Sequence, residues 1–346
     1  DHSAPGTSLA SLGDLNGDGR ADFLVGADNS AFFVLGADGP ATTVELGLSP
    51  FDDDGVGLSV AGGGDFDGDG VPDYIIGAPL TDLEAGENVV EDVGAAYLIS
   101  GQTHSIITRI APDLADGAVA SEAGFGEELS FIDINGDGLQ DVILGANLQP
   151  GMPGEVMILY GTSGAVSSTL SQGDFTGGIG ATLMGQSALH GFGAAVVNAG
   201  DVNNDGIDDL IVGAPGLGSV LSPGGGSVMG GPGGAYVIYG RQDGFASFPG
   251  VDALGPDDGY VIHGFIDSEA VEAAYIGYDL AGVGDINGDG IDDLALRYVD
   301  PFARPGVQVI FGSADNAPTD FTIGSIAPED GFIINGFNSV SAISAA

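Results

Sequence analysis

The side chains of this chain that could do chemistry are concentrated in one nine-residue pattern, which occurs five times. The copies are DLNGDGRAD (14–22), DFDGDGVPD (65–73), DINGDGLQD (133–141), DVNNDGIDD (201–209) and DINGDGIDD (285–293). Each has Asp at position 1, Asn or Asp at 3, Asp at 5, Gly at 6 and Asp at 9. Hard cations such as calcium take about six to eight oxygen ligands, most easily from alternate residues of a loop wrapped around the ion. The spacing therefore predicts calcium loops, in which the Gly permits the positive-φ turn that folds the loop back on the ion.

The predicted ligands are the side chains at positions 1, 3, 5 and 9, together with the main-chain carbonyl at position 7. In chain order they are Asp14, Asn16, Asp18, Arg20, Asp22, Asp65, Asp67, Asp69, Val71, Asp73, Asp133, Asn135, Asp137, Leu139, Asp141, Asp201, Asn203, Asp205, Ile207, Asp209, Asp285, Asn287, Asp289, Ile291 and Asp293. One copy alone could be an ordinary Asp/Asn/Gly turn, whereas five copies in register favour metal binding. We expect about five Ca2+ ions.

The residues after each loop decide what kind of calcium loop this is. An EF-hand would need Glu at position 12 and a helix on each side. Position 12 is apolar in all five copies: Val25, Ile76, Leu144, Val212 and Leu296. The segments that follow, such as FLVGA and YIIGAP, are short, β-branched and closed by Gly, which is typical of buried strands. The pattern therefore predicts calcium loops inside β-hairpins.

The charge balance excludes whole classes of partner. Fifty acidic residues face five arginines and no lysine, for a formal net charge of −45. Such a surface repels nucleic acid and anionic membranes, because phosphate binding depends on Lys and Arg. No apolar run approaches the ~20 residues of a membrane span, so membrane insertion is not expected. There is no cysteine and no visible signal peptide, and the abrupt start at Asp1 is typical of a processed or trimmed protein.

The loops recur at spacings of 51, 68, 68 and 84 residues, which is a propeller- or solenoid-like period. Each unit contains four strand-like segments; in the fourth unit they are 192–199, 209–215, 234–240 and 259–264. Four antiparallel strands of this length form one propeller blade. The prediction is an all-β propeller, with the calcium loops in the strand 1–2 hairpins. We expect residues 1–346 to form a single domain, with units at about 5–50, 51–124, 125–190, 191–265 and 266–346.

The units resemble FG-GAP repeats, the blades of the integrin α-subunit propeller and of many bacterial surface proteins. Phe-Gly stands at 125–126 and 192–193, with Val56-Gly57 and Ile276-Gly277 as variants, and Gly-Ala-Pro stands at 77–79 and 213–215. Gly26-Ala27-Asp28 and Gly145-Ala146-Asn147 are close to the second motif. Two units depart from it, with Pro5-Gly6 in the first and Arg297-Tyr298-Val299 in the last. The resemblance implies a seven-bladed propeller, so five units are either part of a longer protein or a closed five-bladed ring.

Partner binding is expected opposite the calcium loops. In a blade, the strand 1–2 and 3–4 turns share one end, and the longer connections lie at the other. Those connections are 79–94, 215–234 and 265–274. By resemblance to integrins, a protein or glycan ligand would bind there, because long loops on a rigid scaffold carry function. A flexible decoration is the alternative for the Gly-rich 216–233, and self-assembly is a further possibility.

Catalytic patterns are absent from the sequence. It has no GxSxG elbow, no HExxH and no lysine, and His2, His104, His190 and His263 are scattered. The prediction is a calcium-stabilised adhesion or partner-binding module, extracellular or at the cell surface, and not an enzyme. A structural subunit of a surface layer or filament is one alternative. A glycan lyase or hydrolase is another, because paired carboxylates cannot be recognised among so many acids.

Overall fold

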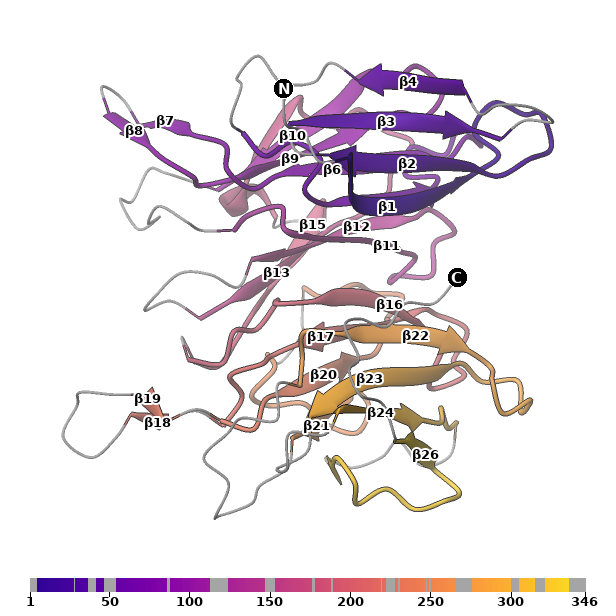
Figure 1. The fold of residues 1–346 in the computed structure, drawn as a ribbon, viewed down its shortest axis with the longest axis vertical. Coiled ribbons are helices and arrows are strands. Elements are labelled where there is room, and N and C mark those ends of the chain that lie inside the picture. The colour runs from indigo at the N-terminus through magenta and orange to yellow at the C-terminus, as the bar shows by residue number, and fades with distance from the viewer. Residues whose placement is uncertain are drawn as a thin grey trace. The chain divides into compact units, whose positions relative to one another are not determined.

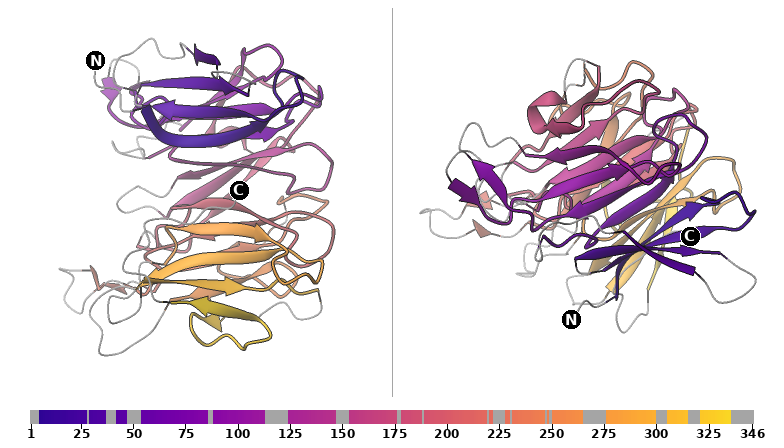
Figure 2. Two further views of the ribbon diagram at one scale, coloured as in Figure 1. Left: turned by 45° about the vertical axis from the view of Figure 1, so that its right-hand side comes forward. Right: turned by 90° about the horizontal axis from the view of Figure 1, so that it is seen from above.

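The computed structural model of the chain describes residues 5–27, 29–36, 42–46, 54–85, 88–112, 124–146, 153–175, 178–187, 189–218, 220–221, 228–229, 231–246, 248, 250–264, 276–299, 305–314 and 321–335. The regular secondary structure of these residues is β-strand, apart from one short 3-10 helix, η1 (Gln172–Asp174). Figure 1 shows the strands gathered into a succession of sheets, and the two views of Figure 2 show their twist. The fold is the predicted β-propeller of five blades.

Each blade is an antiparallel sheet of four strands that follow one another in the sheet. Blade 1 contains β1 (Pro5–Gly13), β2 (Asp22–Ala27), β3 (Ser30–Leu35) and β4 (Thr42–Leu46). Blade 2 contains β5 (Val60–Gly64), β6 (Asp73–Ala78), β9 (Ala95–Ile99) and β10 (Ile106–Ala111). Blade 3 contains β11 (Glu128–Ile132), β12 (Asp141–Ala146), β13 (Glu155–Leu159) and β15 (Gly180–Met184). Blade 4 contains β16 (Val196–Gly200), β17 (Asp209–Gly213), β20 (Gly234–Ile238) and β21 (Gly259–His263). Blade 5 contains β22 (Leu280–Gly284), β23 (Asp293–Val299), β24 (Pro305–Ile310) and β26 (Gly331–Ile334).

The five Asp-rich stretches, here called acidic loops 1 to 5, each join the first two strands of a blade, as predicted. Position 9 of each loop is the first residue of the second strand. In four blades it pairs with a glycine next to a register shift: Gly13, Gly64, Gly200 and Gly284. Such a bulge bends the strand end, which directs the chain into the loop.

Packing divides the chain into two compact units. The first consists of Asp1–Ile132, Gly138–Gln149 and Met157–Thr182, and the second of Asp133–Asp137, Pro150–Val156 and Leu183–Ala346. In the first unit, one core lies between blades 1 and 2, around Leu24, Phe33 and Tyr74. A second core in that unit joins blades 2 and 3 through Ile75, Leu98 and Val142. In the second unit, Ile211, Val237 and Leu294 belong to the core that joins blades 4 and 5.

Successive blades approach through the glycines of the Phe-Gly and Gly-Ala motifs. A Cβ on Gly26 would lie 2.0 Å from the carbonyl oxygen of Gly57, and a Cβ on Gly77 would lie 2.0 Å from that of Gly126. Only glycine leaves room for this backbone contact, which explains why the two motifs recur together. The hydroxyl of Ser59 also donates to the Gly126 carbonyl, at 2.5 Å.

Two short strands not predicted from the sequence tie neighbouring blades at their outer edges. β14 (Thr169–Ser171), from the third repeat, pairs in parallel with β10 of blade 2. β25 (Phe321–Thr322), from the fifth repeat, pairs in parallel with β21 of blade 4. Each added strand covers an edge that would otherwise present unpaired backbone groups.

Candidate metal centre

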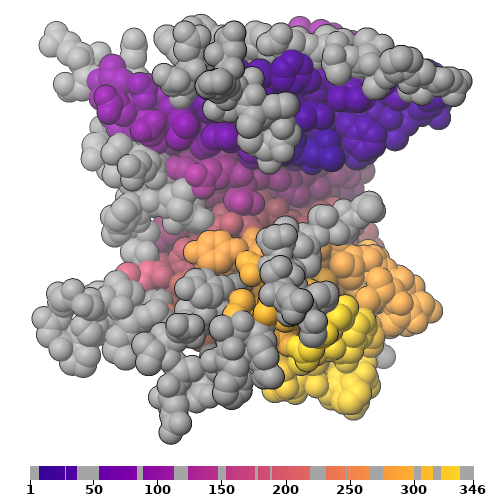
Figure 3. All heavy atoms as spheres, in the orientation of Figure 1, coloured from indigo at the N-terminus to yellow at the C-terminus, as the bar shows by residue number. Residues whose placement is uncertain are grey.

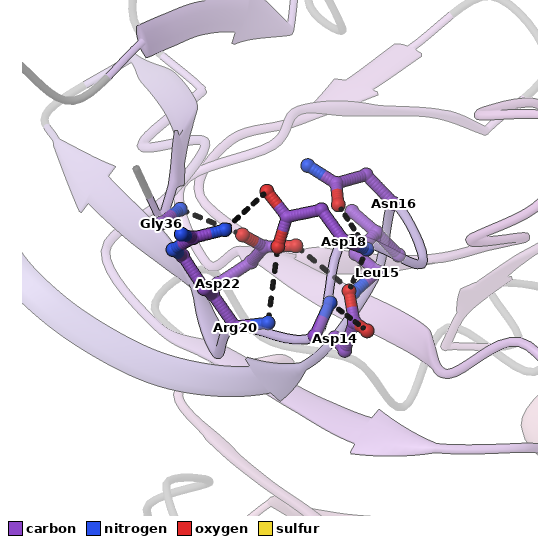
Figure 4. A network of polar contacts seen from close by, with 8 residues as sticks. Asp14, Leu15, Asn16, Asp18, Arg20, Asp22 and Gly36 are labelled. Carbon is purple, nitrogen blue, oxygen red and sulfur yellow. Dashed lines mark hydrogen bonds and ion pairs between the residues drawn. The ribbon is translucent and has the colours of Figure 1, made fainter. Parts of the chain in front are cut away.

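The first acidic loop is held by its own backbone amides (Figure 4). The Asp14 carboxylate accepts the N–H of Asp18 at 2.9 Å and of Gly19 at 2.7 Å. Asn16 Oδ1 accepts the same Asp18 N–H at 3.0 Å, and Asp18 Oδ1 accepts the N–H of Arg20 at 3.0 Å. These successive Asx turns hold the side chains at positions 1, 3 and 5 against the backbone of one tight loop.

The same arrangement recurs in the other loops. Position 1 accepts the position 5 amide in every loop, through Asp65, Asp133, Asp201 and Asp285. Position 3 also accepts it in every loop, through Asp67, Asn135, Asn203 and Asn287. The structure therefore places all the residues predicted as ligands in five similar hairpin loops. Their assignment as calcium ligands stays a prediction.

Position 9 has a second function that the sequence interpretation missed. Its aspartate is fully buried in every blade: Asp22, Asp73, Asp141, Asp209 and Asp293. Asp73 accepts the N–H of Phe66 from its own loop and the N–H of Gly101, after the third strand, both at 2.9 Å. The equivalent glycines in the other blades, Gly36, Gly161, Gly240 and Gly312, donate in the same way. The signal was present, because every third strand is followed by Gly.

Burial raises the pKa of three of these carboxylates, Asp73, Asp209 and Asp293, so that they are harder to ionise without a cation. Desolvation raises the pKa of Asp73 to about 6, with a contribution from neighbouring Asp67. Desolvation raises the pKa of Asp209 to about 8, with Asp205 and Asp201 adding to the shift. The amide hydrogen bonds at both residues lower the pKa, but not enough to cancel this. A bound divalent cation would supply the missing positive charge and restore the ionised form.

In loop 2, three carboxylates of the predicted set lie close enough together to share one ion. Carboxylate oxygens of Asp65, Asp67 and Asp73 all lie within 4.8 Å of one another. Two ligands on opposite sides of a calcium ion, each about 2.4 Å away, would be separated by nearly the same distance. Carboxylate, amide and carbonyl oxygens are hard ligands, which suit calcium better than they suit transition metals.

Loop 1 differs from the others in having a positively charged side chain, Arg20, at position 7. Arg20 Nη1 lies 3.8 Å from Asp18 Oδ2, and both side chains are more than a third exposed. Position 7 is apolar in the remaining loops, where Val71, Leu139, Ile207 and Ile291 stand. The exposed pair is weak, but it places a competing charge beside one predicted ligand.

The long connections carry hairpins at the opposite end of the blade from the acidic loop. Residues 79–94 contain β7 (Leu83–Ala85) and β8 (Asn88–Val90), which pair with each other. This hairpin projects from blade 2 in Figures 1 and 3, and Leu80 and Val89 are 41% and 58% exposed. In blade 4, β18 (Val220–Leu221) pairs with β19 (Val228–Met229). The third predicted connection, 265–274, lies outside the described residues.

The described histidines lie in separate parts of the fold. His104 packs against Phe33, with ring centroids 5.0 Å apart. Burial lowers the pKa of His190, and its Nδ1 has no hydrogen-bond partner. His263 pairs with Gly234 and Thr322 within blade 4. His2 lies outside the described residues.

Two stretches of the chain, 5–43 and 192–238, match the FG-GAP repeat family, so the chain contains FG-GAP repeats. Integrin alpha pat-2 of Caenorhabditis elegans is 30% identical over 270 residues, which are 73% of this chain and 18% of that protein. Integrin alpha-V of Gallus gallus is 27% identical over 287 residues, 82% of this chain and 24% of that protein. The matched region is thus less than a quarter of the length of either relative.

Among solved structures, the Dos1 propeller covers 88% of this chain and 55% of its own, at 13% identity and a TM-score of 0.46. The exotype rhamnogalacturonan lyase YesX covers 89% of this chain and 55% of its own, at 12% identity and a TM-score of 0.38. These similarities are too distant to bear on function. Among the described residues, no helix has the length and apolar character needed to cross a membrane.

Proposed function

We propose that this FG-GAP repeat protein is a calcium-stabilised propeller that works outside the cell or at its surface as an adhesion or partner-binding module, without catalytic activity. The similarity to integrin alpha subunits over most of the chain carries the proposal. It favours a protein partner over a glycan. The relatives are much longer than this chain, so the partners of the whole protein are part of the proposal.

In this proposal, calcium makes each blade rigid at the end that carries the acidic loop. The opposite end of the blades binds the partner. About five ions would be held by the positions 1, 3, 5, 7 and 9 of the acidic loops. The buried position 9 aspartates support this, because each connects its loop to the end of the third strand. An ion at that point stabilises the hairpin and the third strand together.

Binding is assigned to the end that carries the β7–β8 hairpin, with the exposed Leu80 and Val89. Exposed apolar side chains on a projecting element of a rigid sheet are a typical contact surface for a protein. The acidic surface around them selects partners that are not polyanions.

Bead adhesion tests the module directly. Beads coated with the protein should adhere to cells of the source organism in 10 mM calcium and detach in EGTA (a condition chosen well above weak extracellular sites of about 1 mM). The double change Leu80→Ser and Val89→Ser should reduce adhesion. The matched control is Ile106→Ser, which changes an exposed residue at the start of β10 instead. Equal adhesion by both variants, or none by the unchanged protein, contradicts the assigned surface.

Two further measurements separate the alternatives. Light scattering in calcium should show discrete particles, whereas ordered polymers that EGTA dissolves would favour the structural subunit. Incubation with acidic and neutral polysaccharides should release no reducing or unsaturated ends. Release of either would favour the lyase or hydrolase.

A further inference from the structure

The acidic loops are not isolated from one another, because backbone amides of blades 3, 4 and 5 donate hydrogen bonds to the loop of the preceding blade. The amide of Gln140, at position 8 of loop 3, donates to the carbonyl of Asp65, at position 1 of loop 2, at 3.0 Å. The amide of Thr162, after the third strand of blade 3, donates to the position 2 carbonyl of Phe66 at 2.9 Å. The two residues that open loop 2 are therefore held by blade 3.

The same contacts hold loop 4 to blade 5. Asp292 N–H donates to the carbonyl of Asp201 at 3.3 Å, and Ser313 N–H donates to that of Val202 at 2.9 Å. In the reverse direction, Asp201 N–H donates to the carboxylate of Asp292 at 3.0 Å. For loop 3, the donor is Arg241 N–H, 3.0 Å from the carbonyl of Ile134. Loops 2, 3 and 4 thus share one mode of support.

These contacts connect the buried aspartates of successive loops. Phe66 donates its N–H to Asp73 and accepts the N–H of Thr162 through its carbonyl. The neighbouring residue, Gly161, donates its N–H to Asp141 at 2.7 Å. Only a short run of peptide groups therefore separates Asp73 of loop 2 from Asp141 of loop 3. Val202, Ser313 and Gly312 connect Asp209 and Asp293 in the same way.

Position 7 provides a second contact between loops. Leu139 packs on position 4 of loop 2, where a Cβ on Gly68 would lie 3.1 Å from Leu139 Cδ2. Ile207 packs on Gly136, at position 4 of loop 3, where a Cβ on Gly136 would lie 3.0 Å from Ile207 Cγ1. The main chain of the same residues is a predicted calcium ligand. One residue therefore couples an ion in its own loop to the shape of the preceding loop.

We propose that the calcium sites of loops 2 and 3 are completed by the following blade, with Leu139 and Ile207 as positioning residues, so that ions in neighbouring loops bind cooperatively. An ion in loop 3 fixes the Leu139 carbonyl and so holds its side chain against Gly68. Loop 2 is then preorganised and loses less conformational freedom when it binds its own ion. By linkage, an ion in loop 2 tightens loop 3 by the same factor. The inference rests on the proposed calcium binding.

The chain contains its own controls. A Cβ on Gly17, at position 4 of loop 1, would meet nothing within 4 Å, so Val71 of loop 2 makes no corresponding contact. Gly288 of loop 5 is equally open, and its position 2 residue, Ile286, is 49% exposed. Phe66, Ile134 and Val202 at the equivalent position are buried. Coupling should therefore be strong between loops 2 and 3 and weak between loops 1 and 2.

Calcium titration calorimetry of Leu139→Ala against Val71→Ala tests the coupling. Both substitutions shorten a position 7 side chain and leave every predicted ligand oxygen in place. Leu139→Ala should weaken a site by about tenfold, the usual size of an outer-shell effect on a metal site. Val71→Ala should leave the isotherm unchanged. Circular dichroism in calcium checks folding, and Leu139→Val replaces the alanine variant if that variant does not fold.

Removal of single ligands gives an independent readout. Asp137→Asn, in loop 3, should abolish one site and weaken a neighbouring site, whereas Asp18→Asn, in loop 1, should abolish one site only. Superimposable isotherms for Leu139→Ala and Val71→Ala, with equal effects of the two ligand changes, overturn the coupling while calcium binding stands. Absence of any calcium binding by the unchanged protein overturns the proposed calcium sites themselves.

Discussion

Blades 2 and 5 carry almost the same acidic loop, yet the surroundings of the two loops differ. Phe66 at position 2 of loop 2 is buried, whereas Ile286 of loop 5 is half exposed. Gly77 of blade 2 receives the Gly126 carbonyl beside the Ser59 hydroxyl. In blade 5, the positions of Ser59 and Gly77 are taken by Asp279 and Arg297, which form an ion pair.

The difference shows that the repeat motif specifies the loop, while the neighbouring blade specifies its environment. The internal amide network is the same in both loops. Burial and support come from residues more than 70 positions away, such as Thr162 on Phe66. Arg297 fills the place where a neighbouring backbone approaches in blade 2, so blade 5 cannot form that glycine contact.

Calcium removal should have the largest effect and should affect blade 2 more than blade 5. With dissociation constants of about 0.1 to 1 mM, each site adds about 1.4 to 2.7 kcal/mol at ~10 mM calcium. Five such sites rival the ~5 to 15 kcal/mol stability of a typical domain. Scanning calorimetry should show a much lower Tm in EGTA, and hydrogen exchange should rise more at Phe66 than at Ile286. An unchanged Tm would contradict the stabilising role of calcium.

Substitution of the contact glycine should have the next largest effect. In Gly77→Ala, the new Cβ would lie 2.0 Å from the Gly126 carbonyl oxygen, so the two blades must separate. We expect a loss of about 1 to 3 kcal/mol in unfolding free energy, as for other overpacked sites. The matched change at the same position of blade 5, Arg297→Ala, should be milder. Urea unfolding in calcium measures both, and equal losses would remove the distinction between the blades.

The pH dependence should reverse when calcium is removed. The folded-state pKa values of Asp73 and Asp209, about 6 and about 8, exceed the unfolded value near 3.9. In calcium-free buffer, the stability from their neutral forms is therefore present below about pH 4 and is lost as the pH rises to about 8. With calcium, stability should instead rise with pH, because the ion binds the ionised carboxylates.

Urea unfolding at pH 5 and pH 8.5, with and without calcium, measures this reversal. In calcium-free buffer, Asp209→Asn should reduce the loss of unfolding free energy between pH 5 and pH 8.5. Asp293→Asn in blade 5 should leave most of that loss unchanged. Burial also raises the pKa of Asp293. If unfolding free energy depends on pH in the same way with and without calcium, the buried aspartates do not bind the ion.

The smallest effect is expected from the ion pair of blade 5. Arg297→Gln removes the charge that faces Asp279, and both side chains are about one-fifth exposed. The loss of unfolding free energy should stay near 1 kcal/mol or below and should shrink in high salt. Urea unfolding at two salt concentrations measures it. A loss as large as that of Gly77→Ala would mean that the pair has taken over the function of the glycine contact.

Much of the fold was predictable from local pattern. Gly at the end of every third strand and apolar residues after every loop fixed the strand positions to within a few residues, as β3 and β20 show. β14 and β25 were not predictable, because strands of two or three residues have no alternation to detect, and their parallel partners lie in another repeat. The second partner of each position 9 aspartate was missed although a Gly follows every third strand, because the separation between the two residues along the chain differs from blade to blade. Gly101 is 28 residues from Asp73, and no spacing rule relates them.

The sequence by itself determined the five acidic loops, their Asx turns and the hairpins that contain them, because those contacts join residues less than ten positions apart. Only the tertiary structure decided which loops are covered and which glycines face a neighbouring backbone. It also decided how the buried aspartates are linked. Those features depend on the approach of blades whose contacting residues are 31 to 111 positions apart. A repeat motif that is nearly identical in each blade cannot carry that information.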